Sequence, residues 1–209
     1  YNHAAALNAG FDRAVGDYVL VADDDTEPLH ANWLSLLLGV LAQPDVACVA
    51  PRLVASRDKD TKLVGGPMVL GIHGVAGSYL GEEQRLEEVG VYSRLQLTQD
   101  VSAVAGHLFL LRKADWAAVG GFDSKSFGLH FPVLDFCLRL SQLGKRHVWT
   151  PLVGVLHHGG KTLSSLRRDV RQHVLIAESE IQERENLLRR WAPQLAADPN
   201  YNRHLSLRT

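Results

Sequence analysis

The stretch VLVADDDTEP, residues 19–28, decides the fold because it ends a run of apolar residues with three consecutive aspartates. The preceding YVLVA is apolar throughout, which is typical of a central strand covered on both faces. Helical periodicity at residues 3–15 predicts a helix before this strand in the sequence, and a second helix is predicted to begin at Pro28, after it. VACVAPRLV at 46–54 predicts another buried strand. The alternation predicts an α/β domain with helices packed on a largely parallel sheet.

The second half of the chain continues this pattern. A strand is predicted at 102–113, and FPVLDFCLRLSQLG predicts a helix with Pro132 in its first turn and Gly144 past its end. RHVWTP and VGVLHHGGK predict two more short strands. Residues 55–100 are polar or glycine-rich without a period, and we expect them to form an irregular excursion over the mouth of the sheet.

A long charged helix is predicted after the α/β part. We divide the chain into an α/β domain at 1–163 and a C-terminal helical extension and tail at 164–209. The apolar seam of the helix is predicted to contain Leu166, Val170, Val174, Ala177, Ile181, Leu188 and Trp191. Such a helix is compatible with a homodimer and equally with packing on its own domain, and the sequence leaves both open.

Composition excludes several classes of protein. Lys and Arg number 22 against 23 Asp and Glu, so no general attraction to nucleic acid or an anionic membrane is expected. Cys48 and Cys137 lie in apolar segments, which predicts buried thiols without disulfides in a reducing compartment. We find no apolar run of the roughly 18 residues that a membrane span requires.

The three aspartates point to a cation. Adjacent carboxylates repel one another, and a divalent cation offsets that repulsion. In an extended backbone Asp23 and Asp25 share one side and Asp24 faces the other. Oxygen ligands of this kind suit Mg²⁺ or Mn²⁺. The alternative is a solvated turn in which one aspartate caps the following helix.

Several segments together resemble a known family. NHAAALNAGFDRAVGDYVLVADDDTEPLHANWLSLLL, GHLFLLRKADWAAVGGFD, DFCLRLSQLGKRHVWTP and VLHHGGK occur in the order and spacing of the family-2 glycosyltransferases over about residues 2–163. The tail RRWAPQLAADPNYNRHLSL is similar to the end of bacterial transferases that build O-antigen and related surface glycans. The resemblance implies the GT-A fold, a Rossmann-like mixed and mostly parallel sheet with flanking helices, here followed by the long helix.

The resemblance also implies site residues. Asp23 and Asp25 match the aspartates that hold Mn²⁺ or Mg²⁺ and, through the metal, the diphosphate of a nucleotide sugar, with Asp24 between them. His157 matches a histidine that approaches the metal or the diphosphate, and its neighbour His158 is a substitute. A polar rim at a strand end is the structural alternative for this histidine pair.

Two further residues are candidates for donor binding. Asn8 matches an asparagine near the nucleotide, and a helix cap is its structural alternative. In HHGGK, Lys161 and backbone N–H groups could meet a phosphate.

The catalytic base is where the sequence departs from the family. The family usually has an acidic pair four and five residues before the cysteine of CLR, and here Pro132 and Val133 stand there. Asp135 keeps the second acidic position and is one candidate base, although it can also pair with Arg139 one turn on. His130 is the fallback candidate.

The implied reaction is an inverting transfer of a sugar from a nucleotide-diphosphate sugar to a glycan or lipid-linked carbohydrate acceptor. The implied location is cytoplasmic, with peripheral association at the inner face of the membrane left open. Relatives begin with a nucleotide-reading strand that does not precede Tyr1, so we expect an N-terminally incomplete GT-A domain. The alternative functions are a non-catalytic module that binds glycan or protein and a structural dimerisation piece.

Overall fold

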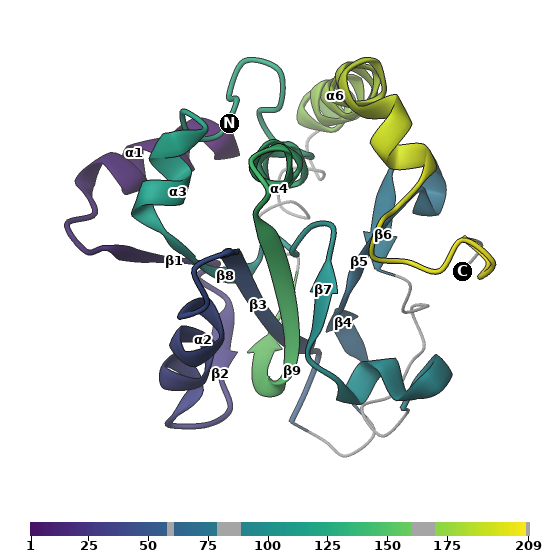
Figure 1. Cartoon of the computed structure of the whole chain (residues 1–209). Helices are drawn as coiled ribbons and strands as arrows, with labels where there is room; N and C mark the ends of the chain where they lie inside the picture. Colours follow the sequence, from purple (N-terminus) through teal and green to yellow (C-terminus); the bar gives the residue numbers. More distant parts are fainter. Residues whose placement is uncertain (58–60, 79–88, 160–169, 208–209) are drawn as a thin grey trace.

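A mixed β-sheet lies at the centre of the computed structural model, which describes residues 1–57, 61–78, 89–159 and 170–207 (Figure 1). The helices are α1 (His3–Arg13), α2 (Trp33–Leu41), α3 (Lys113–Ala118), α4 (Pro132–Gln142) and α6 (Val170–Ala196), with short 3₁₀ turns η1 (Ile72–Gly74) and η2 (Val91–Gln96). The strands are β1 (Tyr18–Ala22), β2 (Thr26–Pro28), β3 (Val46–Val54), β4 (Leu63–Gly65), β5 (Met68–Leu70), β6 (Ala76–Ser78), β7 (Gln99–Val101), β8 (Leu108–Arg112) and β9 (Arg146–His157). The main sheet has the order β1-β8-β3-β9-β2, with β4 beside β3 and β7 beside β9.

The α/β architecture with flanking helices is confirmed, but the sheet is not mostly parallel. Among the described strands, β3 and β9 run parallel, whereas β1, β2, β4, β7 and β8 all pair in an antiparallel sense. Continuous apolar strands led to the parallel expectation. β3 and β9 are buried over most of their length, but β1 is an edge strand in which Tyr18 and Leu20 are 46% and 36% exposed. An apolar run therefore established neither cover on both faces nor strand direction.

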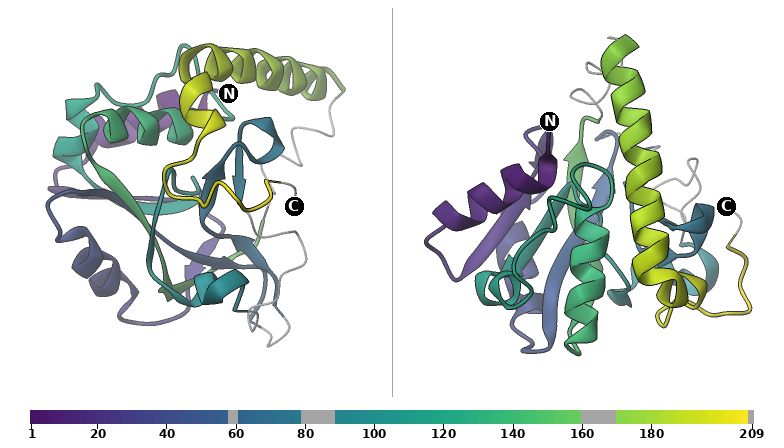
Figure 2. Two further views of the ribbon diagram at one scale, coloured as in Figure 1. Left: turned by 45° about the vertical axis from the view of Figure 1, so that its right-hand side comes forward. Right: turned by 90° about the horizontal axis from the view of Figure 1, so that it is seen from above.

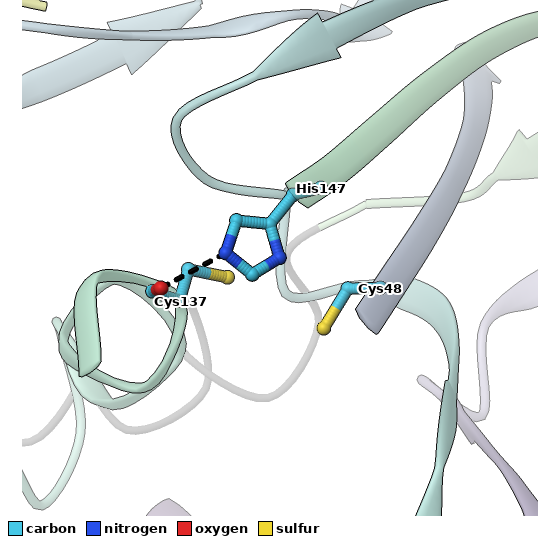
Figure 3. A group of neighbouring side chains, drawn as sticks. All are labelled: Cys48, Cys137 and His147. Atoms are coloured by element: carbon cyan, nitrogen blue, oxygen red, sulfur yellow. Dashed lines mark hydrogen bonds between the residues drawn. The ribbon is translucent and has the colours of Figure 1, made fainter. Parts of the chain in front are cut away.

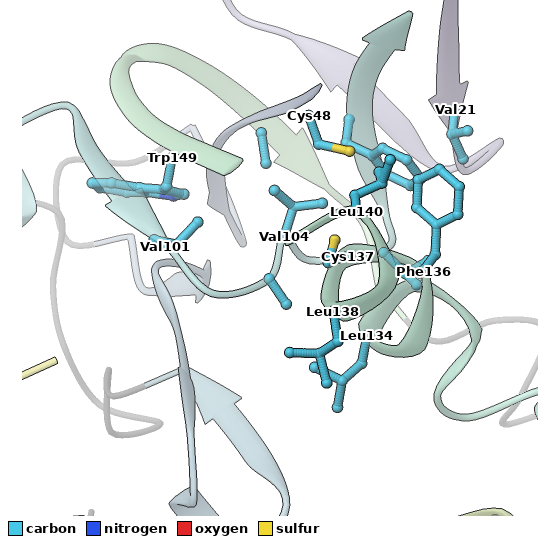
Figure 4. Packing of buried hydrophobic residues seen from close by; sticks show 14 of the residues in the cluster. Val21, Cys48, Val101, Val104, Leu134, Phe136, Cys137, Leu138, Leu140 and Trp149 are labelled. Carbon is cyan, nitrogen blue, oxygen red and sulfur yellow. The ribbon is translucent and has the colours of Figure 1, made fainter. Parts of the chain in front are cut away.

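Two apolar layers cover the two faces of the sheet. In β8, Leu108 and Leu110 pack with Leu37 and Leu41 of α2, whereas alternate residues such as Phe109 face the opposite core. That second core contains residues of α1, α4 and α6 (Figures 2 and 4). Because side chains alternate along a strand, the sheet needs an apolar residue at nearly every position, and the strand sequences supply it.

Several predicted elements have different bounds. The bounds of the predicted strands at 18–22 and 46–54 are confirmed, as is the helix that begins with Pro132. The segment 18–22 is not the central strand that was expected, however, because β1 lies at an edge of the main sheet. Pro28 does not open a helix: it ends β2 at an edge of the sheet, where its missing N–H is tolerated, and α2 begins five residues later. The strand predicted at 102–113 is limited to β8.

Two predictions on the second half of the sheet also change. The two short strands predicted after residue 145 are one strand, β9, with an irregularity in its pairing to β3 between Pro51 and Arg52. The excursion at 55–100 is less irregular than expected, because β4 to β7 lie within its described residues.

The C-terminal helix packs on its own domain, with a different seam from the predicted one. Of the predicted seam, Trp191 is confirmed as buried, Val174, Ile181 and Leu188 are 49%, 61% and 39% exposed, and Leu166 lies outside the described residues. The other buried residues among the described side chains of α6 are Ile176, Glu183, Leu187 and Leu195. The shift has a physical reason: the buried face contains a carboxylate, so an apolar pattern alone selected the wrong stripe. Among the described helices, none combines the length and apolar character needed to cross a bilayer.

Glu183 fixes α6 against the start of α4. Its Oε1 accepts hydrogen bonds from the backbone N–H groups of Gly128 and Leu129 at 3.0 and 2.9 Å. Its Oε2 accepts from the N–H groups of His130 and Phe131 at 2.9 and 3.2 Å. These N–H groups belong to the segment that leads into α4, and the carboxylate satisfies them beside the positive end of the helix dipole.

We expect Glu183→Gln to lower the free energy of unfolding by about 2 kcal/mol, because an amide NH₂ would replace one of the two accepting oxygens and leave buried donors unsatisfied. Urea denaturation followed by circular dichroism measures this change. Glu180→Gln, on an exposed position of the same helix, is the matched control and should change stability by less than about 0.5 kcal/mol. Equal effects of the two substitutions would contradict the anchoring role.

Candidate metal and donor site

The aspartate segment is a short connection held at both ends. The N–H of Asp23 donates to the carbonyl of His107 at 2.8 Å, which extends the pairing of β1 with β8 by one residue. Three residues on, Thr26 already pairs with His157 of β9, and its hydroxyl donates to the carbonyl of Asp23 at 2.7 Å. The aspartates therefore lie between the start of β8 and the end of β9.

Two histidines meet the aspartates at this point. Nδ1 of His107 lies 2.9 Å from Oδ2 of Asp23. Nε2 of His157 lies 3.2 Å from Oδ1 of Asp25 and 3.9 Å from Oδ2 of Asp23. The centroids of the two imidazole rings are 4.4 Å apart. Asp24 is exposed and is not part of this group. The reason is a turn at Asp24 and Asp25, closed by the hydrogen bond from the N–H of Thr26 to the carbonyl of Asp23, and not the alternation of an extended strand.

The environment of His157 favours its neutral form. Burial lowers the pKa of His157, and the neighbouring His107 lowers it further, against the opposing effect of Asp25 and Asp23. Burial likewise lowers the pKa of His3, which lies close enough to be influenced by Asp23 and His107. A neutral imidazole keeps a lone pair for a metal ion.

The donor set fits a divalent cation. One ligand atom each from Asp23, His107 and His157 lies within 4.8 Å of the others, and Asp25 adjoins His157. Carboxylate and imidazole donors together suit Mn²⁺ and similar ions, whereas Mg²⁺ prefers oxygen alone. His107 was not among the residues predicted from the sequence. It directly precedes the apolar run LFLLR of β8, as the aspartates directly follow the apolar run of β1, and antiparallel pairing of these two runs brings the two positions together.

Asn8 has a structural environment. Its Oδ1 accepts from the N–H of Phe122 at 2.9 Å, and its Nδ2 donates to the carbonyl of the same residue at 2.8 Å. The side chain thus ties α1 to the turn at Gly120 and Gly121, two glycines with positive φ. Asn8 lies inside α1 and does not cap it, so the predicted helix-cap alternative is wrong in detail. The contacts with Phe122 occupy both ends of the amide and give Asn8 a structural role that needs no nucleotide.

Asp135 is a buried ion-pair centre. It is fully buried, its Oδ2 accepts from Arg139 at 2.7 Å, and its Oδ1 accepts from Arg190 and the Trp191 indole at 2.8 and 2.9 Å. A base must reach the acceptor hydroxyl, and this carboxylate is instead committed to two guanidinium groups. Its geometry favours the structural explanation over the catalytic one.

The remaining candidates are placed elsewhere or not described. His130 directs Nε2 to the carbonyl of Ile176 at 3.3 Å and so contacts α6; no contact joins it to the aspartates in the described part of the chain. Val133 is buried, and its side chain packs close to Gly106, next to His107. Lys161 lies outside the described residues.

Comparison with known proteins identifies the class. The family model for "Glycosyl transferase family 2" matches residues 1–115, more than half of the chain. Two solved structures share the fold: GalNAc-T7 with UDP, GalNAc and Mn²⁺ (TM-score 0.56, 15% identity, 75% of this chain and 30% of that one) and a mannosyltransferase from Pyrobaculum calidifontis with GDP-Man and Mn²⁺ (TM-score 0.50, 16% identity, 93% and 55%). The chain belongs to glycosyltransferase family 2 and has the GT-A fold.

Curated relatives are all longer proteins. A protein of Sinorhizobium fredii, "Uncharacterized protein y4gI", is 30% identical over 99% of this chain and 22% of its own length. The "Pre-mycofactocin glycosyltransferase" of Mycobacterium tuberculosis is 32% identical over 74% of this chain and 29% of its own length. The "O-antigen biosynthesis protein RfbC" of Myxococcus xanthus is 26% identical over 99% of this chain and 15% of its own length. The chain thus spans less than a third of each.

We expect Asp135→Asn to lower the free energy of unfolding by about 3 kcal/mol, because it removes the buried countercharge of Arg139 and one of the two carboxylates that Arg190 binds. The same variant, measured where it is still folded, should bind Mn²⁺ with unchanged affinity. Urea denaturation and calorimetric titration provide the two measurements. Asp12→Asn, at an exposed position of α1, is the control for the loss of one carboxylate. Weaker Mn²⁺ binding by a stable Asp135→Asn protein would contradict the structural assignment.

Proposed function

We propose that this chain forms the metal- and diphosphate-binding part of an inverting glycosyltransferase, which moves a sugar from a nucleotide-diphosphate sugar to a glycan or lipid-linked acceptor in bacterial polysaccharide synthesis. The observation that carries the proposal is the convergence of Asp23, Asp25, His107 and His157 at the end of a GT-A sheet. Membership of family 2 and the Mn²⁺-containing structures with the same fold support it.

Within this proposal the four side chains hold Mn²⁺. Bound there, Mn²⁺ would supply Lewis-acid stabilisation of the charge that develops on the departing diphosphate. Asp25 is 14% and His157 10% exposed, so these two donors are held in place by the surrounding protein. Asp23 and His107, at 33% and 45%, face the open side, from which a nucleotide would enter. The metal preference proposed for the site is Mn²⁺ over Mg²⁺, because two of its donors are imidazoles.

The acceptor side of the reaction lacks an assigned base. Asp135 is committed to its ion pairs, and Val133 presents an apolar side chain where the family resemblance expects an acid. His130 stays the candidate base of this proposal, because it is half-buried rather than sealed in the core. This arrangement also favours a second candidate function, a GT-A module that binds a metal and a nucleotide without transferring sugar.

We expect Asp25→Asn, His107→Ala and His157→Ala each to weaken Mn²⁺ binding by at least about tenfold, because each removes one proposed ligand. Isothermal titration of the chain with MnCl₂ measures this, and electron paramagnetic resonance of bound Mn²⁺ gives a readout that does not depend on activity. Zn²⁺ and Mg²⁺ titrations test the metal preference.

Matched controls are available within the same two motifs. Asp24→Asn removes a carboxylate from the same triplet, and His158→Ala removes the exposed neighbour of His157; both should bind Mn²⁺ as the wild type does. Equal losses in Asp24→Asn and Asp25→Asn would indicate a diffuse acidic effect and contradict the proposed ligand set.

Nucleotide binding separates the two candidate functions. The transferase proposal predicts that UDP or GDP binds in the presence of Mn²⁺, that Asp25→Asn abolishes this binding, and that a UDP- or GDP-sugar is turned over. Binding without turnover of any donor sugar would favour the non-catalytic module. The absence of Mn²⁺-dependent binding to every nucleoside diphosphate would contradict both.

A further inference from the structure

A second group of metal-binding side chains lies in the core, away from the aspartates. Cys48 of β3, Cys137 of α4 and His147 of β9 converge there (Figure 3). One ligand atom from each lies within 4.8 Å of the others, and the three residues are at most 1% exposed. Cys48 and His147 are direct partners in the parallel pairing of β3 with β9, so their side chains extend from the same face of the sheet.

The hydrogen bonding of His147 determines which of its two ring nitrogens can bind a metal ion. Its Nε2 lies 2.8 Å from the carbonyl oxygen of Cys137 and 3.2 Å from Oγ of Ser141. A carbonyl accepts hydrogen bonds and cannot donate them, so the proton of the neutral ring is on Nε2. Nδ1 therefore carries the lone pair. A ring N–H bonded to a backbone carbonyl, with the other nitrogen exposed to a ligand, is the usual arrangement of a metal-binding histidine.

Nδ1 of His147 has no hydrogen-bond partner among the described residues, although it is buried. An unpaired acceptor in the core is unfavourable, because it has lost its hydrogen bonds to water without replacement. Both cysteines are free thiols. The unpaired nitrogen and the two sulfur atoms thus form a group of three potential metal ligands to which no other function is assigned.

From this arrangement we propose that Cys48, Cys137 and His147 bind a thiophilic d¹⁰ cation, Cu⁺, in a buried site independent of the proposed Mn²⁺ site. Sulfur and imidazole donors select soft cations, whereas the carboxylates at Asp23 and Asp25 suit harder ones. On binding, each coordinating thiol releases its proton to solvent and no electron is transferred. Among the described residues the group contains three ligands. Structural Zn²⁺ almost always takes four, so the ligand number favours Cu⁺.

The test is anaerobic titration of the reduced chain with Cu⁺ in competition with a coloured Cu⁺ chelator, both by direct addition and during refolding. We expect one equivalent to bind. X-ray absorption spectroscopy of the complex should report two sulfur neighbours and one nitrogen neighbour, and the melting temperature should rise. Cys48→Ala, Cys137→Ala and His147→Gln should each lower the affinity at least about tenfold, since the loss of a mere outer-shell partner already costs about 10–100-fold.

Two controls separate this site from its surroundings. Ser141→Ala removes a neighbour of Nε2 but none of the proposed ligands, and Asp25→Asn removes a ligand of the other site; both should keep Cu⁺ binding within about twofold of wild type, a change of about 0.4 kcal/mol. Circular dichroism verifies that each variant is folded. Three outcomes would overturn the proposal: no Cu⁺ binding by the folded reduced protein, unchanged affinity in Cys48→Ala, or preferential binding of Zn²⁺ by these three residues.

Discussion

The short connection between β1 and β2 is the constraint on which the candidate site depends. Three residues carry the chain from a strand paired with β8 to a strand paired with β9. An extended chain covers at most about 3.5 Å per residue, so the aspartates must stay close to the ends of both partner strands. His107 and His157 occupy those ends, and the backbone pairing therefore brings imidazoles and carboxylates together before any ligand binds. This is preorganisation by the sheet.

A second set of interactions holds the C-terminal helix against α4 and the segment that precedes it. Glu183 accepts four backbone hydrogen bonds at the start of α4, and Asp135 within α4 binds Arg190 and Trp191 of α6. Arg190 also binds Asp123, and despite the opposing effect of burial the bonds from Ser126 and Arg190 lower the pKa of Asp123 to about 2. These ion pairs and hydrogen bonds explain how Asp135, which lies next to the family motif CLR, can have a structural role.

The two proposed metal sites lie on different parts of the same sheet and differ in chemistry. The aspartate site is at the ends of the strands, partly exposed, and rich in hard donors. The cysteine group is within the core, between the sheet and α4, and contains soft donors. Cys48 and Cys137 were expected to be ordinary buried thiols. Their burial is confirmed, and His147, which no local pattern distinguished, gives them a potential common partner.

The sequence by itself determined the local features of this protein. The apolar run before the aspartates defined β1 correctly, Pro132 and Gly144 marked the ends of α4, and the ordered motifs indicated family 2 and the GT-A fold. Each of these follows from residues that are near one another in the chain, where periodicity and turn chemistry act.

The tertiary structure decided the rest, because it depends on which distant segments pair. Strand direction, the seam of α6 and the neighbours of Asp135 all follow from packing between segments far apart in sequence. His107 is the clearest case. It lies 84 residues from Asp23 along the chain, and only the antiparallel ladder between β1 and β8 places its imidazole 2.9 Å from that carboxylate.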